Sequence, residues 1–135
     1  MKGIYYKDLS PQEQAYAYKT MKTECSSIQW VNDVFVLAWS DYVAGKFKYD
    51  GATFVQENNG EFWETASFIH DWLNILGYVG KQIDMYFVKI MIELKYGENI
   101  IFERCKWMQW TWLNVLLHRI KRNFKGDKLP EFLIN

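Results

Sequence analysis

One histidine and its neighbouring aspartate are the residues best placed in this sequence to do chemistry. His70 and Asp71 are adjacent in a segment with a helical pattern, so their side chains point about 100° apart. They can serve one cleft from two directions but cannot stack as a hydrogen-bonded pair. Asp84 follows near the start of the next predicted helix. If its carboxylate reached His70, it would hold one ring nitrogen and leave the other as a base or metal ligand. His70 and Asp84 are the candidate catalytic residues.

Two further aspartates are candidate metal ligands at the same cleft. Asp50 lies in a predicted turn, and Asp71 follows the histidine directly. A histidine oriented by one aspartate, with a second aspartate for a divalent cation, is a workable hydrolytic or metal site. The structural alternative stays open, because a His-Asp pair on an amphipathic helix often only caps a loop and carries a surface charge. The sequence identifies no particular metal.

Helical signals dominate the chain on both sides of these residues. Ser10 can cap a helix that has Pro11 at its first position, and Glu13 completes a capping box. We expect this helix to run to about Lys22, with a break at Ser26-Ser27. Its candidate inner residues are Tyr16, Ala17 and Met21.

Three more helices are predicted downstream. The first is expected over 61–76 with a stop at Gly77, and its predicted inner residues are Phe62, Ala66, Ile69 and Leu73. The second, over 82–95, has the clearest amphipathic stripe, and Gly97 follows it. The third, over 98–123, is apolar on nearly every side, which is typical of a helix buried centrally or shared with a partner. The stripe of the second consists of Ile83, Tyr86, Phe87, Ile90, Met91 and Leu94.

The segment between the first two helices suggests β-structure. The run 34–39 is short, apolar and rich in β-branched and aromatic residues, which favours a buried strand, although a helical turn is not excluded. The segment 43–49 alternates, with Phe47 and Tyr49 on one face and lysines on the other, and Asp50-Gly51 forms a turn signal. We therefore predict a mostly helical α+β fold. A small N-terminal β-hairpin or meander would pack on a bundle of about four helices, in a single domain over 1–135.

Composition excludes several classes of protein. The 135 residues are 50% apolar and carry 16 basic against 16 acidic side chains, so no overall field recruits nucleic acid. Two cysteines, Cys25 and Cys105, are too few for a disulfide-stapled secreted domain, which favours a reducing compartment. The N-terminus shows no signal peptide, and the longest uncharged apolar run near the C-terminus, 107–117, is too short to span a bilayer.

The order of these motifs is similar to that in a phage and prophage family catalogued as domain of unknown function 1353. Members typically show a valine-x-glycine-phenylalanine segment before an aspartate-glycine-alanine-serine turn, then a helix with histidine-aspartate-tyrosine and a helix with alanine-aspartate-x-x-phenylalanine. The matching segments here are 43–53, 66–73 and 83–87, with Met91 and Gly97 beyond them. The resemblance covers about 43–97. It departs at Trp72 and Asn74, where tyrosines are expected, and at Phe54-Val55, where isoleucine-proline is common.

This resemblance implies a tailed-phage context and a shared set of polar positions, which would be Asp50, His70, Asp71 and Asp84. It implies no reaction. The expected function is a virion or assembly component of the tail, neck or connector region, located in the virion or the host cytoplasm. Its partners would be other phage structural proteins or further copies of itself. The alternative is a metal-assisted hydrolase, perhaps directed at cell walls. The candidate partner-binding residues are Trp107, Trp110 and Phe132.

Overall fold

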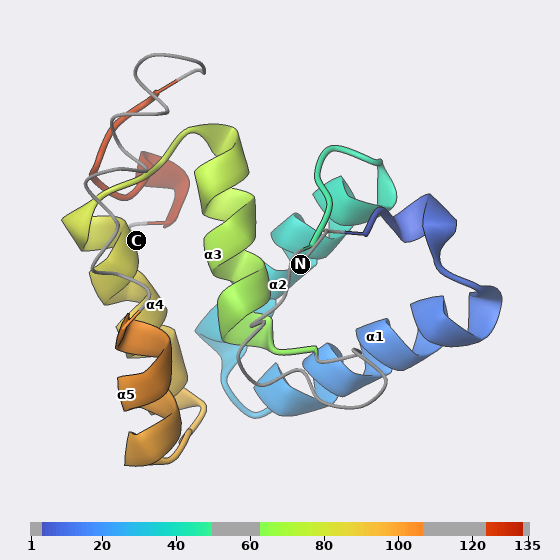
Figure 1. Cartoon of the computed structure of the whole chain (residues 1–135), viewed down its shortest axis with the longest axis horizontal. Helices are drawn as coiled ribbons and strands as arrows, with labels where there is room; N and C mark the ends of the chain where they lie inside the picture. The colour runs from blue at the N-terminus through green and yellow to red at the C-terminus, as the bar shows by residue number, and fades with distance from the viewer. Residues whose placement is uncertain (1–3, 50–62, 107–123, 134–135) are drawn as a thin grey trace. The chain divides into compact units, whose positions relative to one another are not determined.

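The computed structural model describes residues 4–49, 63–106 and 124–133, and these form helices joined by short connections (Figure 1). The chain divides into two compact units, Met1–Asp71 and Trp72–Asn135. Two such units can belong to one domain, so the single-domain prediction stays a prediction. No helix in the described parts is long and apolar enough to cross a bilayer. The helices are η1 (Tyr6–Asp8), α1 (Pro11–Cys25), α2 (Gln29–Val43), α3 (Thr65–Leu76), α4 (Lys81–Glu93), α5 (Glu98–Cys105) and η4 (Glu131–Leu133).

Helix α1 begins where its capping signals predict. The Ser10 backbone N–H donates to Glu13 Oε1 at 2.7 Å, and the Glu13 N–H donates to Ser10 Oγ at 3.2 Å. This reciprocal pair is a capping box, and it satisfies two N–H groups that a helix start otherwise leaves without partners. Ala17 and Met21 are buried as predicted, whereas the prediction for Tyr16 was wrong, because 54% of that residue is exposed.

The predicted strand over 34–39 is wrong, because these residues lie in the middle of helix α2. The buried residues of α2 recur at helical spacing over more than three turns, and the six-residue apolar run is only a part of that pattern. The β-branched residues that favoured a strand divide between the two sides of the helix: Val34 is buried, but Val36 is 48% exposed. The buried set is Val31, Val34, Phe35, Ala38 and Tyr42.

The predicted β-hairpin is also absent from the described residues. Helix α2 ends at Val43, and the chain then passes through a turn in which Gly45 has a φ of 79°. The alternation after it reflects burial on one side of the chain, since Phe47 and Tyr49 are buried and the lysines between and before them are exposed, but it does not belong to a strand. Tyr49 makes one isolated antiparallel bridge, to Ile4, with N···O distances of 3.0 and 3.1 Å. The predicted turn at Asp50-Gly51 lies outside the described residues.

Aromatic side chains form the core of the first unit around Phe68, on the first part of α3. Phe68 is fully buried, and its ring centroid lies 5.3 to 5.9 Å from five other rings. Thr65 fixes the start of α3 on α1: its Oγ1 donates to the Met21 carbonyl at 3.0 Å, and its N–H donates to Glu24 Oε1 at 2.9 Å. The five rings around Phe68 belong to Phe35, Trp39, Tyr42, Phe47 and Tyr49.

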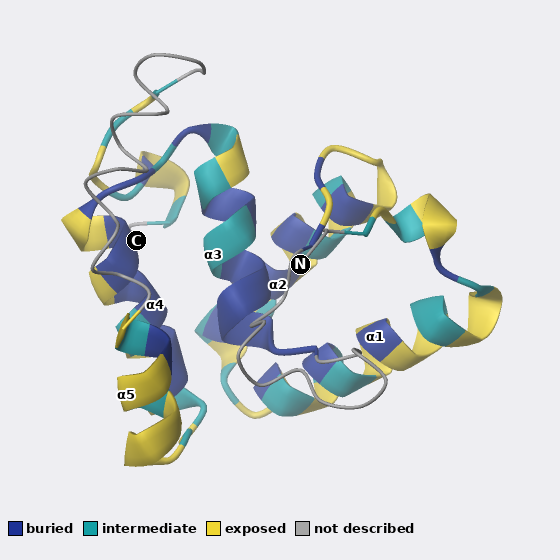
Figure 2. Ribbon diagram, viewed as in Figure 1, coloured by how far each residue is buried: buried dark blue, intermediate teal, exposed yellow. Residues whose placement is uncertain are grey.

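The second unit is built on α4, whose predicted inner stripe is confirmed except at Leu94, which is half-buried. Figure 2 shows the buried side of α4 and the largely exposed surface of α5. Gly77, with a φ of 103°, ends α3 where the sequence predicts. Its carbonyl accepts from the Lys125 N–H at 2.8 Å, and the Val79 N–H donates to the Gly126 carbonyl at 3.0 Å. The segment 124–126 is thereby held against the α3–α4 connection. The predicted helix over 98–123 is described only as far as Lys106.

Candidate functional site

His70 and Asp71 lie on consecutive positions of α3, and both residues are half-buried. Both also interact with neighbouring groups in the structure. Because consecutive residues point about 100° apart on a helix, they face different surroundings, as the sequence predicts. Half-burial with interactions suits either a structural pair or the rim of a site.

Asp84 lies in the first turn of α4 and is 8% exposed, which is unusual for a carboxylate. Its backbone N–H donates to the Gly80 carbonyl at 3.0 Å, closing that first turn. Burial raises the pKa of the Cys105 thiol on α5. The negative charge of Asp84 raises this pKa further. Arg104, the residue before this cysteine, is 3% exposed. Asp84 thus belongs to a polar region at the contact between α4 and α5, which the sequence did not reveal.

A metal centre made of the four predicted polar residues stays a prediction. His70 and Asp71 belong to the first unit, Asp84 belongs to the second, and Asp50 lies outside the described residues. No group of three or more histidine, cysteine, aspartate or glutamate side chains that could hold a metal ion occurs among residues 4–49, 63–106 and 124–133.

Of the three candidate partner-binding residues, one lies in the described part of the chain and two do not. Trp107 and Trp110 lie outside the described residues. Phe132, in η4, is 51% exposed, and its ring makes an edge contact with Trp72 at a centroid distance of 6.1 Å. Phe132 therefore packs partly within the second unit and leaves half of its surface for other contacts.

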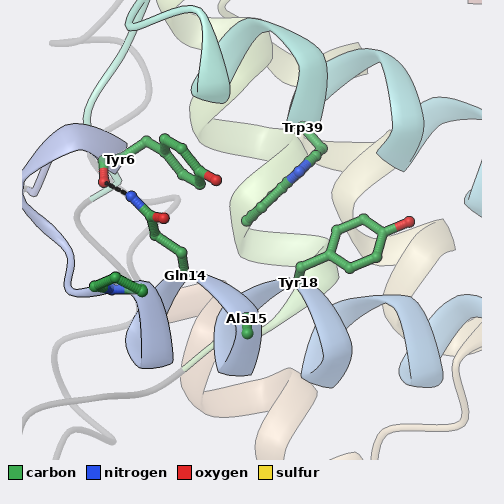
Figure 3. Close-up of a pocket in the computed structure, with 6 residues that line it drawn as sticks. Tyr6, Gln14, Ala15, Tyr18 and Trp39 are labelled. Atoms are coloured by element: carbon green, nitrogen blue, oxygen red, sulfur yellow. Dashed lines mark hydrogen bonds between the residues drawn. The ribbon is translucent and has the colours of Figure 1, made fainter.

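The first unit contains an aromatic groove that the sequence did not predict (Figure 3). Three elements contribute to it: η1 through Tyr6, α1 through its N-terminal half and Tyr18, and α2 through Trp39. The Trp39 ring lies between the two tyrosines, with centroid distances of 5.7 Å to Tyr6 and 5.2 Å to Tyr18. The groove has a volume of about 370 Å³. Its lining consists of Tyr6, Pro11, Gln14, Ala15, Tyr18 and Trp39.

The polar side-chain atoms of this groove include several hydrogen-bond donors. Gln14 Nε2 donates one hydrogen to the Tyr6 carbonyl at 3.1 Å, which ties η1 to α1 and leaves the second amide hydrogen available. Within the part of the chain that the structure describes, the hydroxyls of Tyr6 and Tyr18 and the indole N–H of Trp39 have no hydrogen-bond partner. An apolar lining with a few convergent donors is typical of a binding site.

The helical period of α2 was the sequence signal that could have placed one residue of this groove, Trp39. Once 29–43 is recognised as a helix, Trp39 falls three residues before the buried Tyr42 and one after the buried Ala38, at the edge of the inner face. The approach of Tyr6 and Tyr18 to that edge depends on how three elements pack, which a sequence pattern does not specify.

Comparison with known proteins identifies no relative: no family model, no curated protein and no solved structure matches this chain.

Proposed function

We propose that this chain is a structural or assembly protein of a tailed phage, a virion component in the tail, neck or connector region, held in place by helix packing against other phage proteins or copies of itself. The phage context comes from the order of the sequence motifs over 43–97. The mode of action is proposed from the surface of the second unit.

The proposal rests on the exposure of large apolar side chains of α4 and α5 to solvent. Met85 and Ile92 lie seven residues apart on α4, so they share one face of that helix, and they are 59% and 60% exposed. On α5, Ile100 is 43% exposed and Phe102 is 65% exposed. Among the residues of α5, all of which are described, Arg104 alone is buried.

Such surfaces favour a protein that works in contact with other proteins. Single exposed apolar residues are ordinary, but large ones that recur along two neighbouring helices indicate an interaction site. Methionine and phenylalanine are enriched in the buried centres of protein interfaces, where they contribute apolar area and adaptable packing.

A charge placed on the exposed face tests the proposal. The variant Phe102→Lys should leave folding intact, because the side chain is mostly in water, but should prevent its burial against a partner. In a phage that lacks its own copy of this gene, F102K should fail to support particle production that the unchanged chain restores. The matched control is Asn99→Lys, because Asn99 is a neutral, exposed residue of the same helix and receives the same single added charge. Normal particle production with F102K would overturn the proposal for this face.

The metal-assisted hydrolase is the second hypothesis, and His70 separates the two. If His70 is structural, His70→Ala should lower the free energy of unfolding by about 0.5–1.5 kcal/mol, as expected for the loss of an interaction made by a half-buried side chain. If His70 is catalytic, the same variant should keep its melting temperature and lose activity on cell-wall material. An unchanged melting temperature would count against the structural role of this residue.

A further inference from the structure

We propose that the aromatic groove of the first unit binds an extended, proline-rich peptide segment of a partner protein in the polyproline II conformation. The groove involves none of the exposed residues of α4 and α5. Its ligand is therefore independent of the proposed assembly function, and either proposal can fail without the other.

The ring arrangement provides flat apolar surfaces for proline rings. Tyr6 and Trp39 meet edge to face, with an interplanar angle of 88°, so their rings form two walls at right angles. Tyr18 extends the wall on the other side of Trp39, at an interplanar angle of 53°. The small side chain of Ala15 lies between Gln14 and Tyr18 on the α1 side and leaves the floor open (Figure 3). Grooves lined by aromatic rings are the general means of recognising polyproline II segments.

The donors of the groove match the acceptors of such a peptide. A polyproline II helix has no internal hydrogen bonds, and proline lacks an N–H, so its backbone presents carbonyl oxygens only. The groove presents the indole N–H of Trp39, the hydroxyl of Tyr6, and the second amide hydrogen of Gln14, whereas the Tyr18 hydroxyl points away from the other lining residues (Figure 3). The backbone of such a ligand is already extended before binding, so little conformational entropy is lost on binding.

Two other ligand classes match less well. Sugars place hydroxyl donors as well as acceptors against a protein, and quaternary ammonium groups are favoured by negative charge beside the aromatic rings. Among the described residues, the lining contains no carboxylate, and the Trp39 indole N–H can only donate, so it matches a backbone carbonyl. A volume of about 370 Å³ is at the small end for ligand sites and suits a few residues of an extended chain.

The test uses the whole chain and a ten-residue all-proline peptide as the probe. The chain has seven tryptophans, so the indole N–H signals are resolved by two-dimensional ¹⁵N–¹H NMR, and the Trp39 signal is assigned by its loss in Trp39→Phe. Addition of the peptide should move the Trp39 signal downfield as its N–H bonds to a carbonyl, and should move the other indole signals less. A glycine-serine peptide of the same length should move none.

A matched pair of tyrosines on α1 then locates the contact. Tyr18 lines the groove and is 39% exposed, whereas Tyr16 is 54% exposed and lies outside it. Tyr18→Ala should weaken peptide binding about three- to tenfold through the loss of one aromatic wall, and Tyr16→Ala should leave it unchanged. A second variant, Ala15→Leu, should fill the floor and weaken binding while the melting temperature stays the same.

Three results would overturn the inference. One is no shift of the Trp39 signal at millimolar peptide. Another is equal loss of binding in the variants of Tyr16 and Tyr18. The third is a shift of the Trp39 signal with a cello-oligosaccharide or with tetramethylammonium but not with the peptide, which would assign the groove to a sugar or a cation.

Discussion

Replacing Phe68 by alanine should remove a large part of the stability of the first unit. Phe68 is fully buried, and its centroid distances to five neighbouring rings are 5.3 to 5.9 Å. Truncating a buried phenylalanine costs about 3–5 kcal/mol through lost transfer free energy and the cavity left behind. Aromatic pairs add about 0.5–1.5 kcal/mol each in isolation, but contacts that share one ring are not additive. We therefore expect a loss of about 4 kcal/mol.

Urea unfolding followed by circular dichroism measures this loss. Since small proteins are stable by only about 5–15 kcal/mol, Phe68→Leu provides a milder variant with an expected loss of about 1.5 kcal/mol. Val36→Ala is the matched control, because Val36 lies on α2 and is 48% exposed, and it should change the free energy of unfolding by less than about 0.5 kcal/mol. A loss below about 1 kcal/mol for Phe68→Ala, with an unchanged dependence on urea, would refute the aromatic core described above.

Three further outcomes are expected. Ser10→Ala should destabilise the protein by about 1 kcal/mol in a thermal melt because it breaks the capping box of α1. Ser40→Ala, on the exposed part of α2, should change the stability little. Equal effects of the two substitutions would contradict a stabilising role of the Ser10 cap. Gly80→Ala should lower the free energy of unfolding by about 2–4 kcal/mol, since φ is 149° and an added Cβ would lie 2.3 Å from the Asp127 Cβ. Gly45→Ala, at a φ of 79° with nothing within 4 Å, should cost only the backbone strain of about 1 kcal/mol. A smaller loss of stability for Gly80→Ala than for Gly45→Ala would be inconsistent with this packing. Burial raises the pKa of Cys25 from 9.0 to about 11, so the unfolded chain loses this proton first and stability should fall as pH rises from about 9 to 11. The urea midpoint should therefore fall less steeply over this pH range in Cys25→Ala than in the unchanged chain. An equal slope in the two proteins would show that the Cys25 thiol does not cause the fall.

The helices with strong local signals were predictable from the sequence. The capping box at Ser10 and Glu13 lies within four consecutive residues, so sequence distance and spatial distance coincide there. The stripe of α4 repeats over three turns, which is long enough to separate a helical period from an alternating one. Local patterns of this kind fix both the start of a helix and its buried face.

Helix α2 was predicted wrongly because a short window was given too much weight. The six apolar residues from Val34 to Trp39 have the composition of a buried strand. The helical spacing of the buried residues is visible only in the longer segment from Val31 to Tyr42. Packing of Phe35 and Tyr42 against Phe68 decides in favour of the helix, and Phe68 is far away in sequence.

The candidate sites depend even more on tertiary packing. The sequence singled out Asp84 as a polar residue near the start of a helix, but its burial and its closeness to Cys105 follow from the contact between α4 and α5. The aromatic groove brings Tyr6, Tyr18 and Trp39 together from three elements. No spacing rule relates those positions, so only the folded chain shows them as one surface.

The number of copies of this chain per virion tests the proposed function most directly. Quantitative mass spectrometry of purified particles from the phage that encodes the chain would supply that number. We expect a fixed count of several or more copies per particle, as for an architectural component. Absence from the particle, together with abundance in infected cells, would contradict the proposed function.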